Sequence, residues 1–239
     1  MIKGIYTSAM AMRQGILRQE ISASNLANAG TTGFKRDRLF SQELTSAEGQ
    51  PENSDPLSKN VGTWTEFSQG AFVPTGGTMD FALQSKGFFV VSDGQGESYT
   101  RDGHFERNSE GQLVDVQGRL VQGEGGNITV PSGLVTVSAD GHINVEGVAI
   151  DKLRVVDFDN PQTLRKAAGS AFVKSPETGV EQSVDSPVVR QGFLENSNVD
   201  TVKEMVEMIS TARNYEINAK LLTTQDATLQ HSVNELGRV

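Results

Sequence analysis

Apolar residues recur at alternating spacings of three and four near both ends of this 239-residue chain. The N-terminal series consists of Ile5, Ala9, Met12, Ile16, Gln19, Ala23 and Leu26. Only Gln19 interrupts it, and the spacing is the a/d pattern of a helix that packs along one apolar seam. Because Gly30 can end a helix, the sequence predicts a first helix over about residues 1–28.

The C-terminal series keeps the same spacing for longer. It consists of Met205, Met208, Ala212, Tyr215, Ala219, Leu222, Asp226, Leu229, Val233 and Leu236. Thr201–Glu204, "TVKE", matches a capping box at the start of this helix, and Gly237 can cap its end. A second apolar set comprises Val202, Val206, Ile209 and Leu221. The stripe is therefore wider than one seam, and we expect a helix of about 36 residues that needs several helical neighbours.

The region between the two series has the texture of β structure. From Phe72 to Phe193, short runs of Val, Ile, Phe and Leu are separated by turns that contain glycine. The pairs Asp93-Gly94 and Asp140-Gly141 are hairpin signals. Residues 153–158, "LRVVDF", predict a central strand. The sequence therefore predicts an all-β domain here.

Together these patterns predict an α+β protein. Its N- and C-terminal helices pair as a coiled-coil-like domain, and the all-β domain is inserted between them. The expected parts are residues 1–35 for the first helix and the segment that ends it, 36–70 for an extended polar link, 71–193 for the β-rich domain, and 194–239 for the long C-terminal helix. The single tryptophan, Trp64, is a possible apolar anchor in the link.

Composition and charge limit the classes of function and the kinds of site that this chain can have. The chain has 21 Lys and Arg against 30 Asp and Glu, which argues against nucleic acid as a partner because phosphate binding needs a basic face. It has no cysteine, so disulfides, zinc–thiolate sites and thiol nucleophiles are excluded. Residues 1–40 carry six of the basic residues, which leaves a membrane-surface amphipathic protein as an alternative. No apolar h-region follows Lys3, so we expect no cleaved secretory signal.

Residues able to do chemistry do not form a recognisable set. His104, His142 and His231 lack metal-ligand spacing, and the first two follow Asp-Gly turns. Gly123–Gly126 lacks the patterns of a phosphate-binding loop. Asp157–Pro161 lacks the spaced ligands of a calcium loop. We therefore expect no enzyme activity, no cofactor, no metal and no small-molecule substrate.

Three stretches carry a resemblance to a known family. Asn25–Lys35, "NLANAGTTGFK", resembles the N-terminal signature of the flagellar rod and hook proteins, although Gly30 and Thr32 depart from it. Gly192–Lys220, "GFLENSNVDTVKEMVEMISTARNYEINAK", is similar to the C-terminal signature of that family. Tyr99–Phe105, "YTRDGHF", resembles its β-domain motif. These matches cover nearly the whole chain in the right order.

The resemblance implies a non-enzymatic structural subunit of the bacterial flagellar basal-body rod. Such a subunit polymerises through its terminal helices into the tubular drive shaft in the periplasm, and it is exported through the flagellar type III apparatus without a cleaved signal. Its partners would be copies of itself, other rod subunits and that apparatus. Within the family the chain looks most like a proximal rod subunit, and a distal rod or hook-type axial subunit is the alternative.

In that setting the segment after the first helix should link a polymerising helix to the rest of the protein. We expect Asn25 and Asn28 to bond to backbone groups freed at the helix end. Gly30 and Gly33 would allow left-handed backbone, and Phe34 would lock the turn. Residues 35–36, a Lys-Arg pair, suit the negative end of the helix dipole.

Assembly contacts are expected at both ends of the chain and in the polar link. Residues 41–69 would reach over a neighbouring subunit. The residues that we expect to carry assembly are Asn25, Asn28, Gly33, Phe34, Trp64, Met205, Met208, Tyr215, Leu222 and Leu229.

Overall fold

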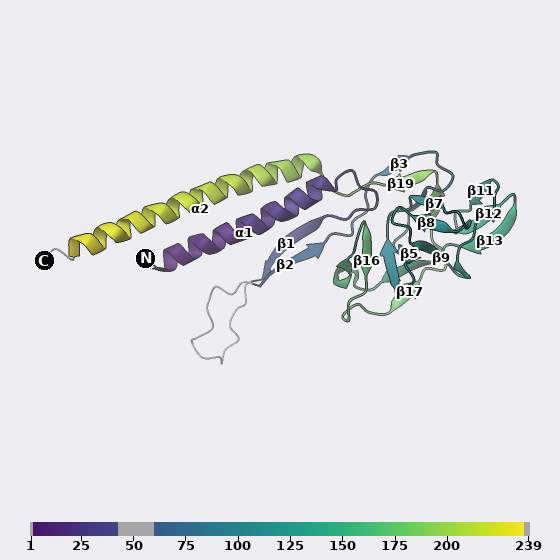
Figure 1. Ribbon diagram of the computed structural model, residues 1–239, viewed down its shortest axis with the longest axis horizontal. Helices are drawn as coiled ribbons and strands as arrows, with labels where there is room; N and C mark the ends of the chain where they lie inside the picture. The colour runs from purple at the N-terminus through teal and green to yellow at the C-terminus, as the bar shows by residue number, and fades with distance from the viewer. Residues whose placement is uncertain (1, 43–59, 237–239) are drawn as a thin grey trace. The chain divides into compact units, whose positions relative to one another are not determined.

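The computed structural model describes residues 2–42 and 60–236 (Figure 1). The chain forms two compact units. The helical unit takes its described residues from 1–27, 37–65 and 200–239, and the β unit consists of 28–36 and 66–199. The chain passes between the two units four times. Within the described residues, neither helix is both long and apolar enough to cross a bilayer.

Two long helices form most of the helical unit. α1 spans Ile2–Ala27 and α2 spans Thr201–Leu236, which confirms both predicted helices. They pack against each other in antiparallel order (Figure 1). The predicted cap of α2 is wrong by one residue. Asp200, and not Thr201, is the N-cap, because its Oδ1 accepts the N–H groups of Val202 and Lys203, each at 3.2 Å.

A β-hairpin completes the helical unit. β1 (Asp37–Gln42) and β2 (Asn60–Thr65) pair antiparallel, and β1 packs against α1. The described part of the expected polar link therefore contains an ordered ladder. Residues 43–59, about half of the predicted link, lie outside the described residues. In this unit α1 lies between α2 and the hairpin (Figure 1).

The β unit contains short strands joined by tight turns, with one turn of 3₁₀ helix. The elements are β3 (Phe72–Pro74), β4 (Phe81–Leu83), β5 (Phe88–Ser92), β6 (Glu97–Thr100), β7 (Phe105–Arg107), β8 (Leu113–Asp115), β9 (Leu120–Gly123), β10 (Gly126–Asn127), β11 (Val135–Val137), β12 (His142–Val145), β13 (Val148–Lys152), β14 (Val155–Phe158), η1 (Pro161–Thr163), β15 (Arg165–Lys166), β16 (Ala171–Val173), β17 (Glu181–Ser183), β18 (Val189–Gln191) and β19 (Phe193–Glu195).

The largest sheet runs in the order β15-β16-β6-β5-β9-β8-β7. β14 pairs with β5 and β17, and β10 pairs with β9. A three-stranded sheet, β11-β12-β13, and the two-strand ladders β4–β18 and β3–β19 complete the unit. All of the pairs are antiparallel. The hairpin turn at Asp93-Gly94 joins β5 to β6, and the turn at Asp140-Gly141 joins β11 to β12, as predicted.

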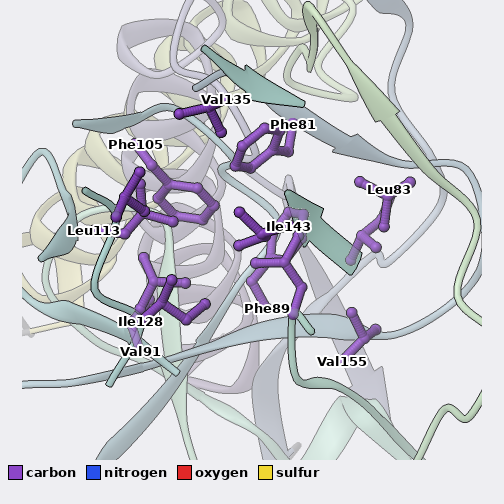
Figure 2. Close-up of a cluster of buried hydrophobic side chains, with 14 of the residues drawn as sticks. Phe81, Leu83, Phe89, Val91, Phe105, Leu113, Ile128, Val135, Ile143 and Val155 are labelled. Atoms are coloured by element: carbon purple, nitrogen blue, oxygen red, sulfur yellow. The ribbon is translucent and has the colours of Figure 1, made fainter. Parts of the chain in front are cut away.

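Two apolar clusters form the core of the β unit. The larger cluster is shown in Figure 2 and contains Phe81, Leu83, Phe89, Val91, Phe105, Leu113, Val121, Ile128, Val130, Val135, Ile143, Val145, Leu153, Val155 and Val189. The smaller contains Phe88, Val90, Tyr99, Val156, Phe158, Leu164 and Phe172. Successive residues of β5 and of β14 enter different clusters, because side chains alternate between the faces of a strand. The prediction of a central strand at "LRVVDF" is confirmed.

Candidate assembly site

The family-like segment at residues 25–35 begins inside the helical unit. Asn25 is buried in the last turn of α1. Its Oδ1 accepts the N–H of Asp37 and its Nδ2 donates to the carbonyl oxygen of Asp37, both at 2.9 Å. The hydroxyl of Thr65 donates to Asp37 Oδ1 at 2.7 Å. Asn25 therefore fixes the start of the hairpin against α1, whereas we expected it to satisfy groups at the helix end.

The turn after α1 is held by local and long-range hydrogen bonds. The carbonyl oxygen of Asn28 accepts the N–H of Thr31 at 3.1 Å, and its side-chain oxygen accepts the Thr31 hydroxyl at 3.3 Å. Within this segment only Gly33 is left-handed, with φ +66°, so the expectation for Gly30 is wrong. A Cβ on Gly33 would also lie 2.2 Å from the backbone nitrogen of Asp102. Conformation and space therefore both require glycine at position 33.

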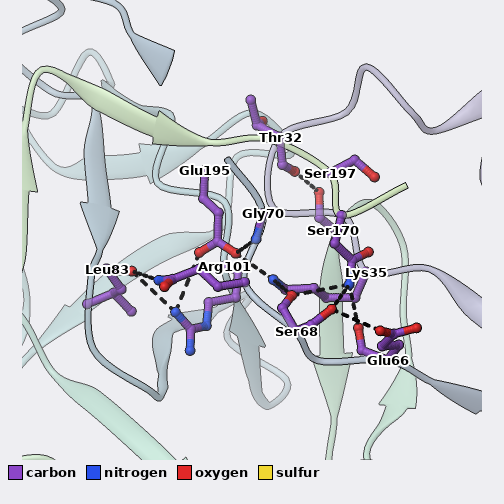
Figure 3. A network of polar contacts seen from close by, with 12 residues as sticks. Thr32, Lys35, Glu66, Ser68, Gly70, Leu83, Arg101, Ser170, Glu195 and Ser197 are labelled. Carbon is purple, nitrogen blue, oxygen red and sulfur yellow. Dashed lines mark hydrogen bonds and ion pairs between the residues drawn. The ribbon is translucent and has the colours of Figure 1, made fainter. Parts of the chain in front are cut away.

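A buried cluster of charges holds the end of this segment in the β unit (Figure 3). Lys35 is 1% exposed, and its Nζ lies 2.5 Å from Oε1 of the fully buried Glu195. The same Nζ donates to the carbonyl oxygen of Ser68 at 2.8 Å. Arg101 approaches the other carboxylate oxygen of Glu195 at 3.5 Å, and the N–H of Gly70 donates to Oε1 at 2.9 Å. We call Lys35, Arg101 and Glu195 the charge cluster.

The charge cluster corrects the expected role of the basic pair. Lys35 is not at the end of a helix dipole but inside the β unit. Burial lowers the pKa of its ammonium group, and the charge of Glu195 acts in the opposite direction. Burial also lowers the pKa of Arg101, and the charge of Glu195 again acts in the opposite direction. Glu195 is thus the group that makes two buried cations tolerable.

Phe34 is buried beside the cluster, and Lys166 covers it. The Nζ of Lys166 lies 4.0 Å from the centre of the Phe34 ring and donates to the carbonyl oxygen of Lys35 at 2.6 Å. The hydroxyl of Thr32 donates to Asp102 at 2.7 Å. Burial raises the pKa of the Asp102 carboxyl, and the bond from Thr32 opposes that shift. The whole of residues 32–35 is therefore bonded into the β unit.

Asn198 ties together the segments of the β unit that lead to and from the helical unit. Its Oδ1 accepts the N–H of Arg36 at 2.8 Å, and its Nδ2 donates to the carbonyl oxygen of Glu66 at 2.7 Å. The N–H of Gly33 donates to the carbonyl oxygen of Glu195 at 2.8 Å. The chain crosses between the two units four times, and hydrogen bonds within the β unit connect the segments at which these crossings occur.

In the helical unit, the seam between α1 and α2 differs from the predicted one. The buried residues of α1 are Ser8, Ser22 and Asn25, and those of α2 are Glu204 and Thr211, among the side chains that the structure describes. All five are polar. The predicted apolar positions lie beside this contact.

Two glycines show where the helices meet. A Cβ on Gly4 would lie 3.0 Å from Nε2 of Gln225, and a Cβ on Gly15 would lie 3.8 Å from Cγ2 of Thr211. On α1 the contact with α2 therefore includes positions 4 and 15, each one residue before a member of the predicted series, Ile5 and Ile16. Small residues at these positions let the helices approach closely, and the apolar residues turn away. Ile16, for example, is 47% exposed.

The predicted assembly residues of α2 differ in their exposure. Met208, Leu222 and Leu229 are half-buried, whereas Met205 and Tyr215 are exposed. The exposed apolar residues on the side of α2 away from its buried residues, which we call its outer face, are Val202, Met205, Val206, Ile209, Ile217 and Leu221. Tyr215, at 36% exposed, lies seven residues from both Met208 and Leu222 and therefore on their side of the helix. The second apolar set that we noted in the sequence thus lies mainly on this outer face.

The remaining predicted assembly residue, Trp64, lies half-buried on β2. It is directly opposite Arg38 of β1, and the guanidinium carbon of Arg38 lies 5.8 Å from the centre of the indole ring. The structure therefore places Trp64 in the helical unit, on the hairpin.

The histidines of the β unit belong to its β structure: His142 begins β12 after the Asp140-Gly141 turn, as expected, and His104 pairs with Asp80 in an isolated β-bridge. His104 Nδ1 lies 2.7 Å from Asp80 Oδ1, and this hydrogen bond raises the pKa of His104. His142 lies 3.5 Å from Asp140, and both side chains are exposed. Residues 2–42 and 60–236 contain no group of three or more His, Asp or Glu side chains that could hold a metal ion.

Sequence models of protein families match three parts of this chain. Residues 5–35 match a family described as flagella basal body rod protein, residues 82–145 match the flagellar hook protein FlgE/F/G D1 domain, and residues 190–236 match the flagellar basal body rod FlgEFG protein C-terminal. The flagellar basal-body rod protein FlgF of Caulobacter vibrioides is 34% identical over 235 residues, which cover 95% of this chain and 96% of that protein. This chain belongs to the flagellar basal-body rod protein family.

Two further relatives in this family are a FlgG protein and a second FlgF protein. The flagellar basal-body rod protein FlgG of Bacillus subtilis is 29% identical over 261 residues, covering 98% of this chain and 99% of that protein. FlgF of Salmonella typhimurium is 33% identical over 236 residues, covering 93% of each. The family resemblance of the three sequence stretches is thereby confirmed.

Each residue of the charge cluster lies in a different matched region of the rod family. Lys35 ends the first region, Arg101 lies within the second, and Glu195 lies within the third. Sequence reasoning missed this cluster, although its members stand inside the three stretches that carried the resemblance. The only signal was that each of these charged residues stands within two positions of an aromatic residue, namely Phe34, Tyr99 or Phe193.

Proposed function

We propose that this rod-family chain is a structural, non-enzymatic subunit of the flagellar basal-body rod and polymerises through its terminal helices. The observation that carries this proposal is the outer face of α2. Its apolar side chains are exposed, with Val202 at 64% and Val206 at 61%, while the contact with α1 buries small and polar groups. A chain that folds in this way leaves its best apolar surface for other molecules.

Burial of that face supplies a driving force for assembly. Each square ångström of apolar surface that a neighbour covers contributes about 25 cal/mol. Contacts between two different surfaces need not close on themselves, so they generate an open helical polymer. That geometry supports a tubular shaft built from many subunits.

The predicted assembly residues take two roles in this proposal. Met205 contacts neighbouring subunits directly, while Met208, Tyr215, Leu222 and Leu229, which share one side of α2, support its contact with α1. The remaining residues link the polymerising helices to the rest of the chain; these are Asn25, Asn28, Gly33 and Phe34. Trp64 contributes to a surface of the hairpin.

We further propose that the partners are copies of this chain, other rod subunits and the flagellar type III export apparatus, with the rod in the periplasm as the destination. The names of the relatives support the basal body as the location. FlgF and FlgG relatives both cover almost the whole chain. A proximal rod position is our first proposal because of the FlgF relatives, and a distal position is the second because of the FlgG relatives.

The experiment is a chromosomal deletion, followed by electron microscopy of purified basal bodies. We expect missing or truncated rods without hooks, restored by the wild-type gene, and the point of truncation distinguishes a proximal from a distal position. Leu222→Asp or Leu229→Asp should fail to restore rods although the β unit unfolds at an unchanged urea midpoint. Intact basal bodies and normal swimming in the deletion strain would contradict the proposal.

A further inference from the structure

Among the residues that the structure describes, the helical unit exposes side chains on two different surfaces, which lie on opposite sides of α1. α1 contacts α2 on one side and β1 on the other (Figure 1). The hairpin leaves its own outward surface open, and α2 leaves its outer face open. Because the two surfaces differ and lie on opposite sides of the unit, one surface of each copy can bind the other surface of the next copy, head to tail.

The hairpin surface is aromatic and basic. Arg38 is paired with Trp64 and Phe40 with Gly62, and cross-strand partners share one face of a ladder. Phe40 is 44% exposed. Its ring covers Gly62, since a Cβ there would lie 2.5 Å from the ring atom Cε1. We call Arg38, Phe40 and Trp64 the aromatic platform.

The helix pair offers a groove of about 400 Å³ beside the start of α2. Its residues are Arg18, Val202, Lys203, Val206, Glu207, Ser210, Thr211 and Asn214. Val202 and Val206 belong to the outer face of α2 and form the apolar part of the groove. Lys203 is paired with Asp200 at 3.1 Å. Among the residues that the structure describes, Glu207 makes no ion pair.

We infer that the aromatic platform of one subunit docks in the α1–α2 groove of a second copy of this chain. This inference rests on the proposed function. The ring of Phe40 packs against Val202 and Val206, and Arg38 of the first copy pairs with Glu207 of the second. Aromatic residues and arginine are the residue types that dominate the binding energy of protein interfaces.

The positions of Arg38 and Glu207 also support a second copy of this chain as the occupant of the groove. Glu207 lies next to Val206 in the chain, and Arg38 stands two residues from Phe40 on the same face, roughly 7 Å away along the strand. One apolar contact and one ion pair can therefore form together. Arg18 at the groove also gives the aromatic rings a cation to lie over. Because platform and groove are different surfaces of each copy, the contact repeats without closing.

The absence of cysteine in the chain allows a direct test by disulfide cross-linking. Phe40→Cys and Val206→Cys are introduced together, the gene replaces the wild-type copy, and purified basal bodies are oxidised. We expect a ladder of cross-linked chains. The matched control is Phe40→Cys with Thr223→Cys, whose second position is exposed on α2 but away from the groove, and it should stay uncross-linked.

The cross-linking outcomes separate the inference from the proposed function. If the variant chain is present in basal bodies but forms no ladder, or if the control forms one equally well, the inference is overturned while the rod function stands. If the chain is absent from basal bodies in both the wild type and the variants, both are overturned.

Charge reversal tests the ion pair. Arg38→Glu and Glu207→Arg should each reduce incorporation into basal bodies by about tenfold or more, because each places two like charges together. Combining the two substitutions should restore incorporation. Combining Arg38→Glu with Glu216→Arg is the control and should not, since Glu216 is exposed on the same helix but outside the groove. Rescue by both pairs, or by neither, would contradict the specific contact.

Discussion

The β unit and the helical unit bury opposite kinds of side chain. In the β unit, phenylalanines such as Phe81 and Phe89 are fully buried and contact one another through two clusters. In the helical unit, the fully buried positions of α1 and α2 are small or polar, while Val206 and Ile209 are exposed. The β unit therefore has a closed apolar core, whereas the described part of the helical unit exposes apolar side chains of α2, which we propose that other subunits cover.

The two units also treat charge differently. The β unit encloses Lys35, Arg101 and Glu195 together, and a buried group of this kind depends on every member. The helical unit buries the carboxylate of Glu204 but keeps charges such as Arg13, Arg213 and Glu216 on the surface, where they contribute little to stability. Substitutions should therefore act on stability in one unit and on assembly in the other.

The largest effect on stability is expected at the charge cluster. Glu195→Gln leaves Lys35 and Arg101 buried without their carboxylate, so the free energy of unfolding of the β unit should fall by about 3–5 kcal/mol. Urea unfolding of the purified chain measures this change. The control is Glu97→Gln, which removes a half-exposed partner of Arg154 and should cost less than about 1 kcal/mol. Equal effects of the two substitutions would contradict a special role for the cluster.

A smaller loss is expected in the segment that leads into the cluster. Gly33→Ala combines positive φ with a clash against the Asp102 backbone, and we expect a loss of about 2–3 kcal/mol. Gly30→Ala is the matched control, because no atom lies within 4 Å of its Cβ position and its φ is not positive, so it should be nearly neutral. The measurement is again urea unfolding, and a neutral Gly33→Ala would show that the local geometry is not required.

The outer face of α2 should show the reverse behaviour. Val206→Asp places a charge where we propose that a neighbour packs, so it should abolish or strongly reduce incorporation into basal bodies. The free energy of unfolding of the β unit should change by less than about 0.5 kcal/mol, because the side chain is exposed. Val206→Thr, which keeps the branched shape, should retain part of the incorporation. Normal rods with Val206→Asp would remove this face from the assembly surface.

The smallest effect concerns pH. The hydrogen bond to Asp80 raises the folded-state pKa of His104, so the folded state binds the proton more tightly than the unfolded state. The resulting stabilisation is fully present below the unfolded pKa, about 6.5, and is lost as pH rises through the folded pKa. A shallow decline in the urea midpoint across that window should disappear in His104→Asn. An identical slope in the variant would assign the decline to another group.

The sequence was sufficient to predict the architecture, because heptad spacing and turn signals are local properties of the chain. It misplaced the helix seam by one residue on α1. A search for apolar repeats selects Ile5 and Ile16, but the helices meet at Gly4 and Gly15, where small size permits close approach. The apolar residues of the repeat instead lie beside the contact between α1 and α2 and stay partly exposed. This placement follows from the three-dimensional packing and not from the sequence pattern.

The charge cluster was beyond prediction for a different reason. Lysine and glutamate are rarely buried, so Lys35 was assigned to a surface helix end. Their burial depends on three segments that are far apart in the chain, and a local sequence pattern does not predict which distant segments come into contact. By contrast, Phe34 and Gly33 could be singled out because they stand in the stretch that carries the family resemblance, where a glycine allows left-handed backbone and an aromatic residue can lock the turn.

The measurement that tests the central claim most directly is hydrogen exchange on the purified chain and on assembled basal bodies. In the free chain we expect the amides of β5 and β14 to be strongly protected and those of residues 202–221 of α2 to exchange rapidly. On assembly, protection should rise in α2 and stay unchanged in β5 and β14. If α2 is as protected in the free chain as the β unit, and assembly does not change it, then the helical unit is complete on its own and the account is contradicted.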